Sequence, residues 1–256
     1  MSKRFIQNAF SDLKKLSKND IAKRKLSFKF NSRFLNYQPY LKDFSSQHYK
    51  IFDELASHLD IQSSIEDLFR GQVVNKTENR PALHHQYRID QKSKDFNYKR
   101  VTDPFISRIK KEGFKNIVTF GIGGSYEGPK LLQEFTQNKL SKLNYYFISG
   151  PDKEEFNSIL KPLSGQKNFY IFASKSLSTD ETLSCLKWLA RERNSMNSIV
   201  ITANSKKALS MGFHDNCIVP IPESIGGRYS IWSPISLSAG TENNFSKFLK
   251  GGFAAD

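Results

Sequence analysis

Short apolar runs alternate with segments of helical spacing through the second half of the chain. The runs, rich in β-branched and aromatic residues, are 117–120, 145–149, 169–173, 199–202 and 218–221. The helical segments between them are 129–140, 153–160, 179–193 and 205–211. This alternation is typical of a parallel sheet, and runs without polar alternation are expected of strands buried on both faces. The pattern predicts an α/β fold with a doubly wound, five-stranded parallel sheet.

The segments before and after this alternation have other patterns. Early apolar residues recur at helical spacing, and they are Leu13, Leu16 and Ile21, followed by Ile51, Leu55 and Leu59. Ser63 and Glu66 fit a capping box before Leu68. We expect residues 1–95 to form a helical region that covers the sheet, and residues 96–221 to form the sheet domain.

Residues 222–256 begin a new pattern. We expect a loop over 222–228, followed by a helical apolar rhythm over 229–249. An apolar helix needs another element to cover it. The segment is therefore expected to be a linker loop and the first helix of a truncated second domain.

Composition narrows the class of protein. The chain has 256 residues, of which 38% are hydrophobic, and this is enough to bury one core. No apolar run approaches the length of a membrane span, and the start, MSKRFIQNAF, lacks the apolar core of a signal peptide. Cys185 and Cys217 suggest neither a disulfide framework nor a metal site. We expect a cytoplasmic protein without membrane contact or bound metal.

The net charge of +14 leaves two interpretations open. A nucleic-acid binder gathers its basic residues on one face, whereas a diffuse excess of positive charge attracts anionic metabolites. Here the Lys and Arg residues are scattered and densest in residues 1–50, with no helix-turn-helix or zinc-finger spacing. The pattern favours a solvated basic surface, with no nucleic acid as partner.

The stretch 117–129, IVTFGIGGSYEGP, carries the strongest candidate chemistry. Glycine turns let backbone N–H groups approach a ligand closely, and a hydroxyl at the start of the next helix favours an anion. Strand, glycine turn, Ser125 and helix therefore indicate a phosphate site. The spacing fits neither the Rossmann fingerprint nor a P-loop, so a small phosphorylated ligand is favoured over a nucleotide.

A second candidate loop, residues 173–182, follows the predicted strand FYIFA. Its hydroxyl groups can donate to phosphate oxygens, and Lys175 can offset the charge. The alternative is that these hydroxyls only cap a helix, because Ser178 and Glu181 also match a capping box. The ligand interpretation gains weight because both loops are predicted at strand ends of one sheet.

Two further groups of residues have less specific signals. Gly226 and Gly227 precede Arg228, whose guanidinium could stabilise a developing oxyanion or pair with a structural carboxylate. His84 and His85 are adjacent; one of them could be functional, but a structural or surface role is favoured. The sequence contains no HxxxH or CxxC metal spacing and no GxSxG motif, so a serine hydrolase is not favoured.

Four segments, in this order, resemble the phosphoglucose isomerase family. Residues 75–84 resemble its "N-x-T-E-x-R-x-x-L-H", and residues 121–129 its "GIGGS-x-x-GP" turn. Residues 174–182 are similar to "SK-T-F-T-T-x-E-T", with Ser176, Leu177 and Ser178 in place of Thr, Phe and Thr. Residues 226–233 are similar to "GGR-Y-S-x-W-S", the most specific of the four. Tyr126-Glu127 replaces the family's more usual Asp-Leu.

The resemblance implies a sugar-isomerase (SIS-type) sheet domain, no cofactor and usually a homodimer. The family interconverts glucose 6-phosphate and fructose 6-phosphate through an enediol, in glycolysis and gluconeogenesis. Arg228 is implied to stabilise the enediolate-like intermediate. The residues implied to bind the substrate are Gly124, Ser125, Ser174, Lys175, Ser176, Ser178, Thr179 and Gly227.

The family takes its proton-shuttling Glu from a Glu-Ser-x-Gly-Lys segment, and a ring-opening His and a Lys from further downstream. None of these motifs is in this sequence. Arg228 cannot replace the base, because a guanidinium does not deprotonate at neutral pH. We expect a fragment that binds sugar phosphate without turning it over. The alternative is a non-catalytic sugar-phosphate sensor with a related domain, which would have no need of residues 226–233.

Overall fold

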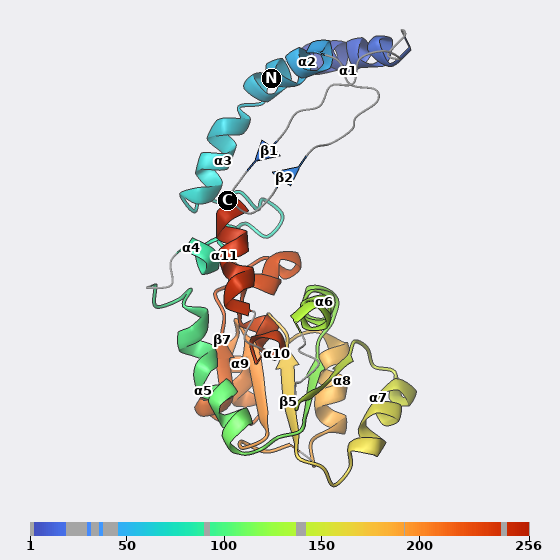
Figure 1. Ribbon diagram of the computed structural model, residues 1–256, viewed down its shortest axis with the longest axis vertical. Coiled ribbons are helices and arrows are strands. Elements are labelled where there is room, and N and C mark those ends of the chain that lie inside the picture. Colours follow the sequence, from blue (N-terminus) through green and yellow to red (C-terminus); the bar gives the residue numbers. More distant parts are fainter. Residues whose placement is uncertain are drawn as a thin grey trace. The chain divides into compact units, whose positions relative to one another are not determined.

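The computed structural model describes residues 3–18, 30–31, 36–37, 46–89, 93–136, 142–191, 193–241 and 245–255 (Figure 1). The chain divides into two compact units, Met1–Arg80 and Pro81–Asp256. The sequence pattern predicts boundaries after residues 95 and 221. The packing contacts of the folded chain instead divide it after Arg80. Residues 222–255 belong to the same unit as the sheet.

The first unit is helical. Its elements are α1 (Lys3–Lys18), α2 (Ser46–His58), α3 (Ile61–Phe69) and the two-residue antiparallel strands β1 (Phe30–Asn31) and β2 (Asn36–Tyr37). Both predicted early helices are present, although Ile21 lies outside the described residues. The predicted capping box is wrong: α3 begins at Ile61 after Asp60, so Ser63 and Glu66 lie inside the helix.

The second unit contains a five-stranded sheet in which all strands are parallel. The strands are β3 (Asn116–Phe120), β4 (Asn144–Ile148), β5 (Asn168–Ala173), β6 (Ser198–Thr202) and β7 (Ile218–Pro220), in the order β4-β3-β5-β6-β7. The predicted strands are confirmed to within one residue at their ends. The chain runs from β3 to an edge strand and returns to the other side of β3, which places the topological switch point between β3 and β5.

The α-helices of this unit connect or flank the strands. They are α4 (Gln86–Ile89), α5 (Tyr98–Lys111), α6 (Glu127–Thr136), α7 (Lys153–Leu160), α8 (Asp180–Trp188), α9 (Ser205–Ser210), α10 (Leu237–Gly240) and α11 (Phe245–Ala255). Short 3₁₀ segments complete it, and they are η1 (Gly123–Ser125), η2 (Lys161–Leu163), η3 (Asp215–Cys217), η4 (Gly227–Trp232) and η5 (Pro234–Ser236). None of the helices in the described ranges combines the length and apolarity that a membrane span needs.

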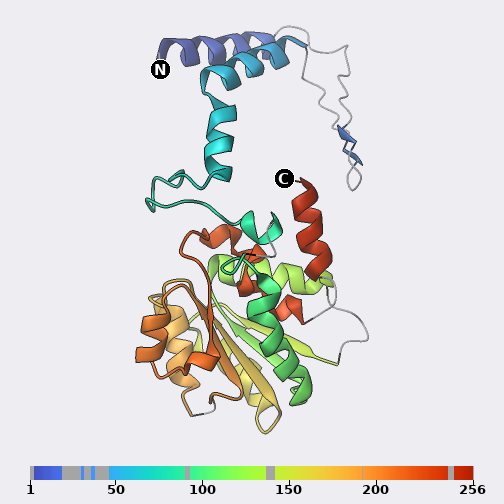
Figure 2. The ribbon, with the colours of Figure 1, turned by 90° about the vertical axis from the view of Figure 1, so that its left-hand side faces the viewer.

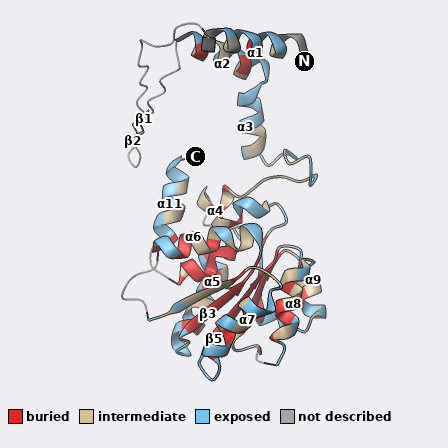
Figure 3. Ribbon diagram, turned by 90° about the vertical axis from the view of Figure 1, so that its right-hand side faces the viewer, coloured by how far each residue is buried: buried red, intermediate tan, exposed pale blue. Residues whose placement is uncertain are grey.

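Helices cover both faces of the sheet, as the alternation predicted (Figure 2). Val118 and Phe120 of β3 pack into one core cluster with apolar residues of α7, α8 and α9. Ile117, on the opposite face, packs into a second cluster with α5, η5 and α10. The strands are the buried centre of the unit (Figure 3), since every residue of β3, β5 and β6 is buried.

The continuous helix expected over residues 229–249 is wrong. The chain there forms η4, η5, α10 and α11 in succession. Ser233 has extended backbone angles and precedes Pro234, whose ring disfavours helical angles at the residue before it. Four apolar residues of the predicted rhythm are nevertheless buried: Ile235 and Leu237 pack in the second cluster, and Phe245 and Leu249 pack with a residue of α6 in a third. The apolar spacing therefore predicted buried positions correctly, but it did not predict that the helix is interrupted.

Candidate functional site

The glycine turn lies immediately after β3, at the carboxyl end of the sheet. Gly121 donates its N–H to the carbonyl of Ile148, at the end of β4, and Gly123 has a positive φ of 54°. The short η1 turn follows, and Ser125 leads into α6. This placement is the one that the sequence predicted for a strand-turn-helix anion site.

The loop after β5 is tied by its backbone to the end of β6. Ser174 donates its N–H to the carbonyl of Ile201. The carbonyl of Lys175 accepts two hydrogen bonds, one from the N–H of Ala203 and one from the hydroxyl of Thr202, both at 2.9 Å. Because these bonds hold the first two residues of the loop, the Lys175 side chain extends from an ordered backbone.

Leu177 anchors the centre of this loop. Its side chain is fully buried in the core cluster that contains α8, and its backbone is in the left-handed region at φ 50°. That conformation costs a non-glycine residue about 1–2 kcal/mol. Its N–H donates to the Ser174 hydroxyl at 3.2 Å, so the strained residue is held by both its side chain and its backbone.

The hydroxyl groups of the loop do not cap α8. Thr179 precedes α8 and makes no side-chain capping bond, so the predicted capping box of Ser178 and Glu181 is wrong. Ser176 and Ser178 are exposed, and their hydroxyl oxygens lie 2.6 Å apart. Ser174 differs from them, because it is buried and its oxygen already accepts from Leu177. The two exposed hydroxyls hydrogen-bond to each other at the surface, while Ser174 organises the loop from below.

The third candidate segment contacts the first. A Cβ built on Gly124 would overlap the carbonyl oxygen of Gly227 and lie 2.5 Å from its carbonyl carbon and 3.1 Å from the N of Arg228. The two backbones are thus in direct contact, and a side chain at position 124 would force them apart. Ser230, a residue that the sequence analysis did not select, bridges both turns through its hydroxyl. This contact places the Arg228 backbone beside the glycine turn.

Charged and aromatic groups surround these loops. Lys175 is half-buried and Arg228 exposed, while Asp180 and Glu181 occupy the first turn of α8. Lys130 of α6 donates to the phenol oxygen of Tyr126 at 3.0 Å, and this bond raises the pKa of the amine, which stays charged at neutral pH. The cations are thus distributed over three segments rather than gathered on one.

One of the two adjacent histidines lies beside this region. The ring of His84 stacks on Tyr229, with ring centroids 4.3 Å apart, and the N–H of Leu83 donates to the carbonyl of Ser224. His85 is buried. These contacts join the start of the second unit to the loop that carries Arg228.

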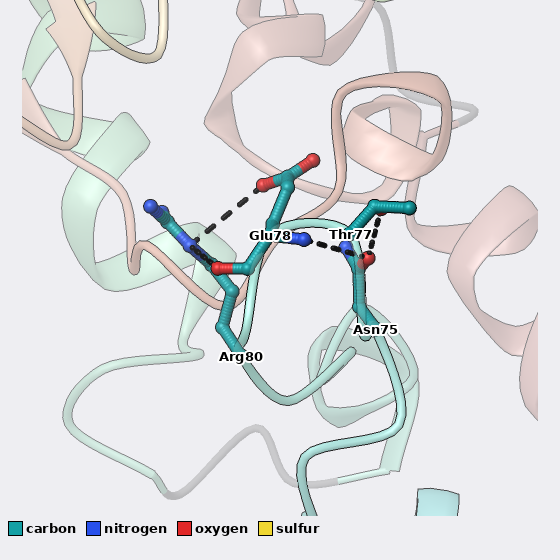
Figure 4. A network of polar contacts seen from close by, with 4 residues as sticks. All are labelled: Asn75, Thr77, Glu78 and Arg80. Carbon is teal, nitrogen blue, oxygen red and sulfur yellow. Dashed lines mark hydrogen bonds and ion pairs between the residues drawn. The ribbon is translucent and has the colours of Figure 1, made fainter.

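The segment 75–80, in the first unit, folds into a loop closed on itself (Figure 4). The Asn75 side-chain oxygen accepts from the Thr77 hydroxyl at 2.7 Å and from the N–H of Glu78 at 3.3 Å. Arg80 approaches the Glu78 carboxylate at 3.7 Å through its Nε. The backbones of Asn75 and Arg80 pair as an antiparallel bridge, so these polar residues shape their own loop.

Two cavities in the second unit lie away from the candidate residues. One, of about 570 Å³, is lined by residues of α4, α5, α10 and α11, among them Lys99, Lys110 and Phe253. The other, of about 330 Å³, lies at the amino ends of β6 and β7, near Arg193 and Cys217. Neither contains a residue that the sequence analysis assigned to the substrate.

Two of the three candidate segments follow neighbouring strands of the sheet. β3 and β5 pair in parallel with Phe120 opposite Phe172, so the loops after them start at the same edge of the sheet, at the switch point. Open parallel sheets bind their ligands at such points. The glycine turn and the hydroxyl loop are at this edge, and the arginine segment contacts the glycine turn. Among the described side chains, no cluster of three or more His, Cys, Asp or Glu could hold a metal ion.

Comparison with known proteins gives the family. Residues 41–256 match the family described as phosphoglucose isomerase. A glucose-6-phosphate isomerase of Buchnera aphidicola subsp. Cinara cedri is 30% identical and covers 98% of this chain, and one of Zymomonas mobilis is 31% identical and covers 96%. The crystal structure of a glucose-6-phosphate isomerase from Chlamydia trachomatis superposes with a TM-score of 0.76 at 18% identity, over 95% of this chain and 54% of that one.

This chain belongs to the phosphoglucose isomerase family, an enzyme family, as the four sequence segments indicated. It spans about half the length of the curated relatives it matches, covering 53% of the Buchnera protein and 50% of the Zymomonas protein. The structural likeness supports the predicted sugar-isomerase type of fold.

Proposed function

We propose that this chain holds the phosphate-binding loops and the enediolate-stabilising arginine of a glucose-6-phosphate isomerase. That enzyme interconverts glucose 6-phosphate and fructose 6-phosphate in glycolysis and gluconeogenesis. The proposal is supported by one observation: two family-like segments begin at the carboxyl ends of the paired strands β3 and β5, and the third contacts the first. Family membership and the names of the relatives support the reaction.

In this proposal the substrate phosphate lies between the glycine turn and the hydroxyl loop. The hydroxyls of Ser125, Ser176 and Thr179 donate to its oxygens, with Ser178 beside Ser176. Lys175 offsets the charge of the dianion, and charge-assisted bonds of this kind are about twice as strong as neutral ones. The exposed position of Ser176 and Ser178, and the absence of a side-chain capping bond from Thr179, support this assignment.

Arg228 acts at the other end of the substrate. Isomerisation removes the proton from C2 of the open-chain aldose, places negative charge on the enediolate oxygens and returns a proton to C1. A fixed guanidinium stabilises that charge as it develops. The base that carries the proton is not among the assigned residues, because serine, threonine, glycine and a charged lysine or arginine cannot serve as one at neutral pH. Binding and turnover are therefore separable in this chain.

A binding titration tests the phosphate assignment. Isothermal calorimetry of the 256-residue chain is expected to show saturable binding of glucose 6-phosphate and fructose 6-phosphate, and none of glucose. Lys175→Met should weaken this binding at least tenfold, because a charged hydrogen bond contributes about 1.5–3 kcal/mol. Lys187→Met, at an exposed position in the last turn of α8, the helix that follows this loop, is the matched control and should bind as the wild type does. Equal binding by the Lys175 variant would contradict the assignment.

A coupled assay tests the separation of binding from turnover. The chain that binds glucose 6-phosphate is expected to form no fructose 6-phosphate above the uncatalysed rate. Isomerase activity near that of a complete enzyme, in a preparation free of host isomerase, would show that a base is present in this chain and refute the proposal.

The partners follow from the same proposal. The ligand is a hexose 6-phosphate, the longer protein is a homodimer in the cytoplasm, and nucleic acid is not a partner. The scattered basic residues support the last point. A gel-shift titration at low salt should show only weak, salt-sensitive retention of duplex DNA, whereas binding that survives 200 mM salt would contradict it.

A further inference from the structure

The contact between the two glycine-bearing turns joins segments more than 100 positions apart. Gly124 belongs to η1, after β3, and Gly227 begins η4, in the arginine segment. Their backbones approach so closely that the space holds no side chain at position 124. The carbonyl groups of Gly124 and Gly227 both lie near this contact and share one hydrogen-bond donor.

Ser230 supplies that donor. The residue is only 4% exposed, and its hydroxyl oxygen lies 2.7 Å from the carbonyl oxygen of Gly227 and 3.1 Å from that of Gly124. A serine hydroxyl has one proton, so the two carbonyls share it in a three-centre hydrogen bond. The hydroxyl therefore joins the glycine turn to the arginine segment.

We propose that Ser230 is a positioning residue that fixes the separation between the phosphate end of the site and Arg228. The inference rests on the function proposed above. A hexose 6-phosphate has a fixed length between its phosphate and its C1–C2 end, so the turn beside the phosphate and the segment with Arg228 must keep one spacing. A displacement of about 1 Å in such a site can cost about a hundredfold in rate. Ser230 is buried and acts only through Gly124 and Gly227.

The position of Ser230 leads to a test with two ligands. Glucose 6-phosphate spans both parts of the site, whereas inorganic phosphate occupies only the part formed by the two strand-end loops. Ser230→Ala is expected to weaken glucose 6-phosphate binding about tenfold, the effect of one lost hydrogen bond near the upper end of its usual range. Binding of inorganic phosphate should change by less than about twofold. A residue that serves only stability would not produce this split between ligands.

Ser233 provides the matched control. It lies in the same segment, is fully buried, and its hydroxyl also donates to a carbonyl three residues earlier, that of Ser230, at 2.6 Å. Its hydrogen bonds lie within residues 230–236 and do not reach the glycine turn. Ser233→Ala should lower the melting temperature as much as Ser230→Ala does, and leave the affinity ratio of the two ligands as in the wild type.

The outcomes separate the two proposals. If the wild type binds neither ligand, the proposed function fails and the role of Ser230 with it. If the wild type binds both, and Ser230→Ala either binds both unchanged or loses both equally, the positioning role alone is wrong. Should Ser230→Ala not fold, Ser230→Cys keeps nearly the same volume with a weaker donor. That variant is then expected to show the same preferential loss of glucose 6-phosphate binding, and its absence would overturn the inference.

Discussion

The turn after β3 and the loop after β5 lie at the same edge of the sheet, but different forces hold their backbones. The turn is shaped by missing side chains, because Gly124 must leave room for Gly227. The loop is shaped by one side chain, that of Leu177, which is buried beneath it in the core. The first device depends on a distant segment of the chain, and the second on the core under the loop itself. Removing the Gly124 contact should therefore disturb only the turn after β3, and removing the Leu177 side chain only the loop after β5.

Leu177→Ala is expected to have the largest effect. It removes a fully buried side chain from the core while the left-handed backbone remains strained. The free energy of unfolding should fall by about 3 kcal/mol, as in other buried Leu→Ala changes. Urea denaturation measures this, with Leu131→Ala on the exposed face of α6 as control, at less than about 1 kcal/mol. A loss at position 177 no greater than at position 131 would show that the side chain does not anchor the loop.

Gly124→Ala tests the other device. The new Cβ would overlap backbone rather than the end of a flexible side chain, so the two turns must separate. We expect a loss of about 2 kcal/mol in unfolding free energy. Gly227→Ala is the control for stability, because a Cβ there meets nothing within 4 Å, and thermal unfolding should change by less than about 0.5 kcal/mol. If the two variants unfold alike, the turns are not in contact.

Leu177→Gly tests the left-handed backbone of the loop, because it should reverse the usual order of stability between glycine and alanine variants. At most positions glycine is less stable than alanine, but at a positive φ it relieves the strain of the left-handed backbone. Leu177→Gly should therefore be more stable than Leu177→Ala by about 1 kcal/mol. Differential scanning calorimetry of the pair decides the question. The usual order, with alanine more stable, would contradict the left-handed conformation.

Cys185 lies in the same core cluster as Leu177, and the alkylation rate of its thiol gives the smallest expected effect. Burial raises the pKa of its thiol to about 11, and its sulfur approaches the carbonyl of Gly150 at 3.4 Å. The thiolate is the reactive form, so alkylation by iodoacetamide at pH 8 should be slow and rise about tenfold per unit up to pH 10. Leu177→Ala should accelerate the reaction by opening this core, whereas Gly124→Ala should not. Equal acceleration by both variants would mean that the two loops are not independent.

The apolar pattern was sufficient to predict much of the second unit. Runs such as 199–202 have no polar alternation, and burial on both faces leaves a parallel sheet as the favoured arrangement. The pattern was wrong where a proline interrupts the helical spacing. Residues 229–249 form several short elements around Pro234 instead of one helix. The capping boxes at 63–66 and 178–181 failed for a related reason: such a motif records that a bond is possible, while the helix start is decided by the packing of the whole segment.

By itself the sequence determined the fold class, the three candidate segments and the family that they resemble, because periodicity, turn chemistry and motifs are local properties of the chain. Only the tertiary structure decided that β3 and β5 are neighbours and that Gly124 touches Gly227, and it alone brought Ser230 to the contact. These contacts join residues as far as 106 positions apart. Their partners are fixed by the path of the folded chain, and no local pattern records that path.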